Sequence, residues 1–159
     1  ETVLARWCAK LGLRDVQEGD RDLANSFLNI LDRGKNDFTR CFRGLSEVST
    51  AGGGPPPIRD EITDVAAFDA WLMAYRARLQ SENLDQAERR AQMHAVNPKY
   101  VLRNHLVQIA IQQAQDGDAS EVDRLFRLLS RPFDEQPENE AYAAAPPDWA
   151  RQISVSCSS

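Results

Sequence analysis

Nowhere in the 159 residues does an apolar run approach the ~18 residues that a helix needs to cross a membrane, so we expect no membrane protein. Basic residues are not in excess either. The 19 Lys and Arg face 24 Asp and Glu, which gives a net charge of −5. A chain of this charge has no field that gathers phosphates, which argues against general binding to nucleic acid or to an anionic membrane surface.

Cysteine is scarce. The three cysteines cannot all pair with one another, and neither their number nor their spacing is that of a secreted disulfide framework. We therefore expect a reducing compartment and a cytoplasmic protein. Sixteen Arg against three Lys is also associated with GC-rich bacterial genomes. The sequence starts at Glu1 without an initiator Met or a signal-type segment, so we interpret it as a piece of a longer polypeptide.

Helical periodicity dominates the sequence. Hydrophobic residues make up 42% and charged residues 27% of the chain, which is ordinary globular usage. A chain of this length buries well over half of its unfolded surface, so it needs no metal or disulfide to fold. Apolar residues recur at spacings of three and four, and no segment alternates like a strand. The predicted fold class is all-α, with about six helices and a long extended C-terminal tail packed on them. The apolar runs begin at Val3, Leu23, Phe38, Val65, Leu84, Val101 and Val122.

Capping residues support these helices. Asp20 and Asp64 are predicted N-caps, and Asn97-Pro98 is predicted to be an N-cap followed by a proline at the first helical position. Asp118 with Glu121 resembles a capping box. Glycine and proline are predicted to stop helices at Gly12, Gly34, Gly117 and Pro132.

Glycine and proline also divide the chain. Residues 51–59 contain three glycines followed by three prolines, which is typical of a linker. This linker is predicted to separate N-terminal helices in residues 1–50 from a helical core in residues 60–131. Residues 132–159 form an acidic, Pro-rich extended tail that cannot build its own core and ends in Cys-Ser-Ser. Its aromatic residues are expected to hold it on the helices: Phe133, Tyr142 and Trp149.

A search for catalytic groups assigns no catalytic, cofactor-binding or metal-binding residue. Gly52–Gly54 lacks the preceding strand and the following Lys-Ser/Thr of a phosphate-binding loop, so we interpret it as part of the linker. His94 and His105 have no Cys or carboxylate at metal-ligand spacing, and we interpret both as histidines satisfied within the helical fold. The alternating charges of residues 85–90 predict a solvated helix face with weak i,i+4 pairs.

The cysteines fall into two groups. Cys8 and Cys41 are in register with the apolar residues of their helices and are predicted to be small buried hydrophobes. Cys157 lies among serines near the end of the chain, with no apolar periodicity to bury it. An exposed thiol can form a thiolate and be oxidised, so Cys157 is the candidate redox residue. The alternative is an inert thiol on a frayed end.

Four short motifs occur in order in the last third of the chain. They are Asn97–Asn104 (NPKYVLRN), Arg131-Pro132-Phe133, Pro146–Trp149 (PPDW) and the final Cys157-Ser158-Ser159. Together they resemble the C-terminal region of the selenoprotein O family, the pseudokinase-like protein adenylyltransferases. Weaker similarities within residues 37–43 and 59–71 extend the resemblance over nearly the whole chain.

This resemblance implies that the longer polypeptide has a protein-kinase-like fold and binds ATP with Mg²⁺ in a flipped orientation. It would transfer AMP, rather than the γ-phosphate, to Ser, Thr or Tyr hydroxyls of target proteins. Such catalysis depends on groups that hold phosphates and metal, and in the family these lie upstream, so no cofactor is expected within this chain. The implied partners are the upstream kinase-like domain and the protein substrates. Cys157 stands where some members carry selenocysteine, which permits a redox role.

Two other classes of protein compete with this interpretation. A non-enzymatic helical interaction module would equally lack catalytic motifs. A coding sequence upstream of Glu1 with a glycine-rich loop, a strand lysine and an Asp-Phe-Gly-like metal site would instead indicate the enzyme. A free-standing thiol oxidoreductase is disfavoured, because no Cys-x-x-Cys motif or resolving cysteine lies near Cys157.

Overall fold

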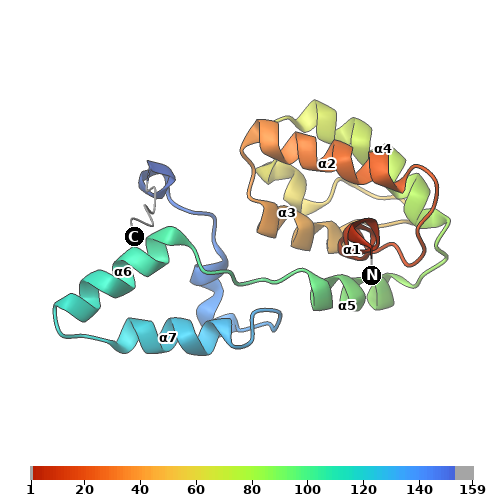
Figure 1. Cartoon of the computed structure of the whole chain (residues 1–159). Coiled ribbons are helices and arrows are strands. Elements are labelled where there is room, and N and C mark those ends of the chain that lie inside the picture. The colour runs from red at the N-terminus through yellow and green to blue at the C-terminus, as the bar shows by residue number, and fades with distance from the viewer. Residues whose placement is uncertain (1, 153–159) are drawn as a thin grey trace. The chain divides into compact units, whose positions relative to one another are not determined.

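The computed structural model describes residues 2–152 and divides the chain into two compact units, which we treat separately. The larger unit is Glu1–Pro98 and the smaller unit is Lys99–Ser159. Every regular element within residues 2–152 is helical, which confirms the all-α prediction; this part contains seven α-helices rather than about six (Figure 1). None of these helices is both long and apolar enough to cross a membrane.

Five α-helices build the larger unit. Its centre is the pairing of α2 with α4, against which α1 and α3 complete the core, while α5 packs on α1 (Figure 1). Two short 3₁₀ turns connect α3 to the rest. The elements are α1 (Val3–Lys10), α2 (Asp20–Gly34), α3 (Phe38–Gly44), η1 (Leu45–Glu47), η2 (Pro57–Glu61), α4 (Val65–Gln80) and α5 (Gln86–Val96).

The division of the chain falls elsewhere than the glycine–proline pattern suggests. Residues 51–56 do form a loop, and residues 57–59 begin η2, but this segment lies inside the larger unit, because α2 before it packs against α4 after it. The segment is held on the unit at two places. The Arg76 guanidinium donates to the Gly54 carbonyl (2.8 Å), and Ile58 is buried in the core. The glycines and prolines predict a backbone break here. The apolar residues before and after this break nevertheless belong to one core.

Aromatic side chains fill the centre of the larger unit. Phe27 stacks on Trp71 with 4.4 Å between ring centroids, and Trp71 stacks on Tyr75 at 4.7 Å. Their polar atoms have partners. The Trp71 indole N–H donates to the Leu23 carbonyl (2.9 Å), and the Tyr75 hydroxyl donates to the Leu11 carbonyl (2.6 Å). Because these polar atoms are satisfied, the rings can be buried at little cost.

Gly12 is required by the contact between α1 and α5. Its φ is +71°, a conformation that L side chains rarely adopt. A Cβ at this position would also lie 2.7 Å from the Met93 sulfur and 3.0 Å from the Arg89 Cγ. The glycine therefore ends α1 and, in the same place, lets α5 approach the chain closely.

Several predicted helix starts need correction. Asp64 does cap α4, accepting from the Ala67 amide (3.0 Å). Asn97-Pro98 starts no helix: Asn97 follows the last residue of α5, and its side-chain amide donates to the Lys10 carbonyl (2.9 Å). The N-cap of α2 is Gly19 rather than Asp20. For Asn97 and Asp20 a long-range partner outweighs the local capping pattern.

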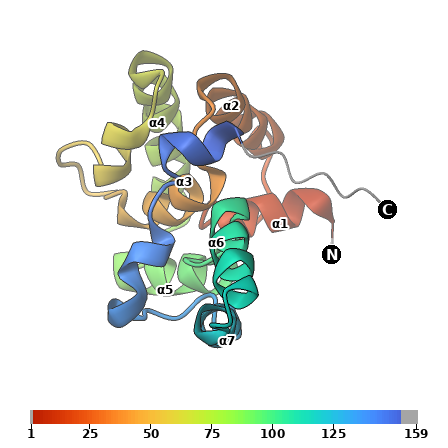
Figure 2. The same cartoon turned by 90° about the vertical axis from the view of Figure 1, so that its left-hand side faces the viewer.

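The smaller unit is a helical hairpin with a folded-back tail. α6 (Asn104–Gln115) and α7 (Ser120–Leu129) pack against each other and are joined by a short turn (Figures 1 and 2). The tail forms two 3₁₀ helices, η3 (Pro137–Ala143) and η4 (Asp148–Gln152), rather than remaining extended throughout. The small core consists of Tyr100, Ala110, Leu125, Leu128 and Ala143.

Main-chain and side-chain hydrogen bonds hold the tail on the hairpin. The buried Gln136 amide donates to the carbonyls of Leu128 (3.1 Å) and Arg131 (2.9 Å), and the Gln136 carbonyl accepts from the Tyr100 hydroxyl (3.0 Å). The Tyr142 hydroxyl donates to Glu121 (2.6 Å), so Glu121 does not complete the predicted capping box. Tyr142 therefore anchors the tail as predicted, and Trp149, although exposed, packs edge-to-face with the His105 ring of α6. The ring of Phe133 is exposed.

Candidate functional site

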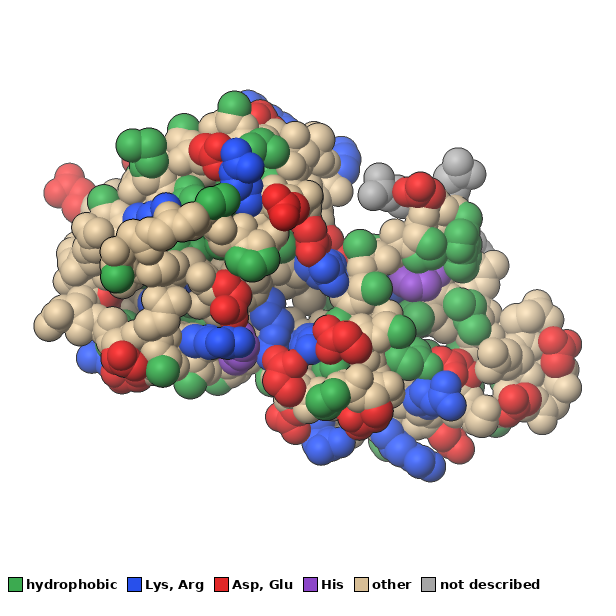
Figure 3. All heavy atoms as spheres, turned by 180° about the vertical axis from the view of Figure 1, so that it is seen from behind, with side chains coloured by type: hydrophobic (Ala, Val, Ile, Leu, Met, Phe, Trp, Pro, Cys, Tyr) green, Lys and Arg blue, Asp and Glu red, His purple; other side chains and the backbone are tan. Residues whose placement is uncertain are grey.

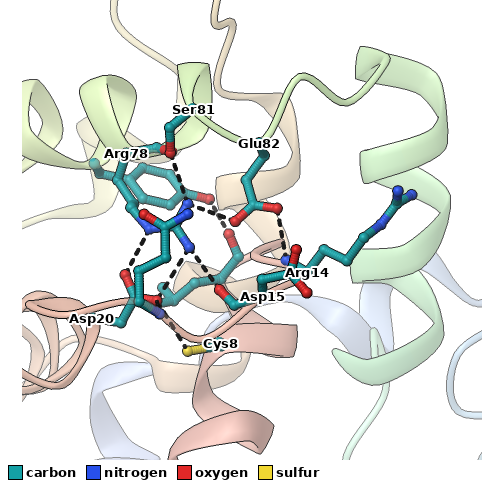
Figure 4. A network of polar contacts seen from close by, with 10 residues as sticks. Cys8, Arg14, Asp15, Asp20, Arg78, Ser81 and Glu82 are labelled. Atoms are coloured by element: carbon teal, nitrogen blue, oxygen red, sulfur yellow. Dashed lines mark hydrogen bonds and ion pairs between the residues drawn. The ribbon is translucent and has the colours of Figure 1, made fainter.

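A cluster of buried charged groups in the larger unit surrounds Arg78, near the end of α4 (Figure 4). Its guanidinium pairs with Asp20 at 2.7 Å and with Glu82 at 2.5 Å. It also donates to the Asp15 carbonyl (2.7 Å) and to the Ser81 hydroxyl (3.0 Å). The Asp20 and Glu82 side chains are only 1% and 3% exposed, so this is a buried charge cluster rather than a surface ion pair.

Both carboxylates are occupied on their other sides as well. Asp20 accepts from the Gln17 amide (2.7 Å), and Glu82 accepts from the Arg14 amide (3.1 Å). The Cys8 thiol lies 3.7 Å from Asp20. Burial, followed by the nearby Asp20 carboxylate, raises the pKa of the Cys8 thiol to about 11. At neutral pH this thiol is protonated and is a poor nucleophile.

This cluster of charges therefore stabilises the fold. One cation binds two carboxylates and a main-chain carbonyl, which ties the loop between α1 and α2 to the end of α4 (Figure 4). The carboxylates face Arg78 and backbone amides rather than an open cavity. Throughout residues 2–152, no group of three or more His, Cys, Asp or Glu side chains is placed to hold a metal ion.

A second buried cation is Arg89, which is only 1% exposed. The charge pattern of residues 85–90 predicts a solvated face, and for Arg89 that prediction is wrong. Its guanidinium donates to the carbonyls of Val48 and Ser46, and lies 3.3 Å from the Met93 sulfur. These carbonyls end the η1 turn, where a cation is favourable because the last carbonyls of a turn are unsatisfied and partly negative. The one-dimensional charge pattern contains no sign of this partner, which lies over 40 residues away.

The two histidines lie in different units. His94 in α5 forms a hydrogen bond of 2.9 Å with the Ser46 hydroxyl. His105 in α6 is buried, and its ring packs edge-to-face with Trp149, with 6.0 Å between the ring centroids. Burial and the nearby Arg103 lower the pKa of His105, so its ring is predominantly neutral at pH 7. The structure thus gives each histidine contacts within its own unit, in line with the predicted packing role.

The cysteines of the larger unit are buried as predicted, each being 1% exposed. Burial, together with the carboxylates of Asp37 and Glu61, raises the pKa of the Cys41 thiol to about 12. Cys157, the candidate redox residue, lies outside the described residues.

The geometry therefore defines a class of protein: an all-helical scaffold in which buried charges stabilise the packing. Comparison with known proteins identifies its family. A model of the family described as "Protein adenylyltransferase SelO" matches residues 3–130, so the chain belongs to the SelO family. The family membership predicted from the sequence motifs is thereby confirmed.

Individual relatives carry a matching description. "Protein nucleotidyltransferase YdiU" of Methylococcus capsulatus is 55% identical over 159 residues, covering 99% of this chain and 32% of the relative. The proteins with the same description from Burkholderia thailandensis and Burkholderia pseudomallei are 55% and 56% identical over 152 residues, covering 95% of this chain and 29% of each relative. The chain thus spans about a third of the length of the curated relatives it matches.

Proposed function

We propose that this chain is the C-terminal helical portion of an enzyme that transfers AMP from ATP to Ser, Thr or Tyr hydroxyls of proteins. The observation that carries the proposal is the match to the SelO adenylyltransferase family over residues 3–130. The relatives' shared description as protein nucleotidyltransferases supports the same reaction class. In such a transfer a nucleotidyl group moves to a protein, and catalysis consists of positioning the phosphates and neutralising their charge.

In this proposal the nucleotide and Mg²⁺ bind to a kinase-like body formed by the rest of the polypeptide, and this chain supports that body. The buried charges favour this division of labour. Arg78 is engaged by Asp20 and Glu82, and Arg89 by main-chain carbonyls, so neither cation is available to a triphosphate. The external partners of the enzyme are its protein substrates, and the enzyme is located in the cytoplasm of a bacterium. Cys157 serves as a redox-sensitive thiol.

The reaction is tested with a longer polypeptide that includes this chain. We expect Mg²⁺ and ATP labelled at the α-phosphate to label a protein target, and ATP labelled at the γ-phosphate to leave it unlabelled. The control is the 159-residue chain alone, for which calorimetric titration with MgATP should show no micromolar binding. Transfer of the γ-label would contradict AMP transfer. Absence of any label, together with capture of a protein partner, would favour the non-enzymatic interaction module.

A further inference from the structure

Helix α4 is apolar on two opposite sides. The side turned to the core carries Phe68, Trp71, Leu72, Tyr75 and Leu79, all buried. At 100° per residue the opposite side is formed by positions 66, 70, 73 and 77, which are spaced by four, three and four. These positions are exposed and uncharged: Ala66, Ala70, Met73 and Ala77. Met73 is 76% exposed, so this outer side is open in the described part of the chain.

The neighbouring helix shows what a solvated helix face looks like in this protein. On α2 the exposed positions are polar or charged throughout: Arg21, Asp22, Asn25, Ser26, Asn29, Asp32 and Arg33. The four outer positions of α4 carry no such residue. A surface helix normally has its polar face opposite the core. In α4 the polar residues Asp69, Arg76 and Gln80 lie to one flank of the outer stripe instead. The difference between α2 and α4 therefore indicates that something covers α4.

A groove of about 650 Å³ runs between α2 and α4 and continues this apolar side. Its apolar lining includes Leu23, Ile30 and Trp71, together with Ala67 and Ala70 of α4. The α2 edge of the groove is polar, with Asp22, Ser26, Asn29 and Arg33. Hydrophobic side chains are visible on the surface of the larger unit in the rear view (Figure 3). Small side chains on α4 let another backbone approach closely, and the 4-3-4 spacing is the repeat along which helices pack. The groove and the outer side of α4 together fit a helix.

We propose that a helix from the rest of the same polypeptide docks on the outer side of α4, with its apolar side chains in the α2–α4 groove. The length of the relatives points to this occupant: about two thirds of each matched relative lies outside the region that this chain covers. The inference rests on the proposed function only in treating the chain as part of that longer protein. It specifies the surface through which the helical portion supports the remainder.

The chain's two methionines provide a direct test in the full-length protein. Met73 lies on the proposed docking surface, and Met93 is buried in the core. Native full-length protein and urea-unfolded protein are treated with hydrogen peroxide, and the oxidation of both residues is followed by peptide mass spectrometry. We expect native Met73 to oxidise at least about tenfold more slowly than unfolded Met73, approaching the protection of Met93. Oxidation of Met73 at the unfolded rate, with Met93 protected, would overturn the proposal.

Matched variants separate docking from folding. Met73→Glu should make peptide segments outside this chain exchange amide hydrogens faster in the full-length protein, whereas Asn25→Glu, which adds the same charge on the exposed face of α2, should not. Protection of Met73 that appears only with rising protein concentration would show that a second copy covers α4 and would refute an intramolecular helix. The protection readout is independent of AMP transfer. Protected Met73 in a protein without transfer activity contradicts only the proposed function, and exposed Met73 in an active enzyme contradicts only the docking.

Discussion

One continuous apolar cluster in the larger unit extends from Cys8 to Met93, whereas the smaller unit has a core of five residues around Tyr100 and Leu128. The larger unit adds buried charges to its core, with Arg78 paired with two carboxylates and Arg89 bonded to main-chain carbonyls. The smaller unit depends more on hydrogen bonds from its tail, centred on Gln136. The same secondary structure is thus stabilised mainly by apolar burial in one unit and largely by side-chain-to-backbone bonds in the other.

Removing the charge of Arg78 should be the most damaging change in the larger unit. Arg78→Met leaves Asp20 and Glu82 buried without their cation, so we expect a loss of about 3–5 kcal/mol in the free energy of unfolding. Urea denaturation followed by circular dichroism measures this loss. Lys35→Met removes a cation from a well-exposed pair with Asp32 and should change stability by less than about 0.5 kcal/mol. Equal losses for the two variants would show that the Arg78 cluster is not desolvated.

The reactivity of the thiols tests how well the core of the larger unit is shielded from solvent. Raised pKa values of about 11 for Cys8 and about 12 for Cys41 suppress their thiolates relative to the ordinary value of 9.0. At pH 8 we expect iodoacetamide to modify both at least about 100-fold more slowly than an unfolded cysteine, because only the thiolate reacts. Cys157 is predicted to react first. Mass spectrometry of the labelled chain ranks all three, and rapid labelling of Cys8 would mean that α1 separates readily from the core.

Truncating the thin core should be milder. Leu128→Ala in the smaller unit is expected to cost about 2–3 kcal/mol, near the lower end for a buried leucine, since few neighbours surround the cavity. Leu31→Ala, in the dense core of the larger unit, should cost about 3–4 kcal/mol. Hydrogen exchange resolved by peptide gives the loss for each unit. A greater cost at Leu128 would reverse the comparison.

The smallest of these effects concerns the tail. Gln136→Ala leaves two main-chain carbonyls, of Leu128 and Arg131, without their donor, and we expect a loss of about 1–2 kcal/mol confined to the smaller unit. Faster amide exchange in residues 137–143 is the specific readout. Gln115→Ala, at an exposed position on α6, is the control and should leave that exchange unchanged.

Periodicity predicted the helices well because each helix buries one apolar side, and that side is written in neighbouring residues. The buried state of Cys8 and Cys41 follows from the same register. What could not be predicted depends on partners far away in sequence. From the sequence Asp20 resembles an N-cap, but in the structure it pairs with Arg78, 58 residues later. Arg89 resembles a surface charge, but in the structure it donates to main-chain carbonyls at η1. Local sequence specifies helix faces, and only the packed tertiary structure shows which charges those faces bury.

The contact between α1 and the end of α5 has a consequence for synthesis on the ribosome. Lys10 donates to the carbonyl of Val96, and the Asn97 side chain donates to the carbonyl of Lys10, so the partners are separated by 86 and 87 residues. At about 5–20 residues per second, the α5 partner of α1 is made about 4–17 s after α1 itself. Helix α2, which also packs on α1, is made much earlier, so only the α5 side of α1 stays uncovered during that time. That side of α1 is therefore a surface that a chaperone can bind while the larger unit is still being synthesised.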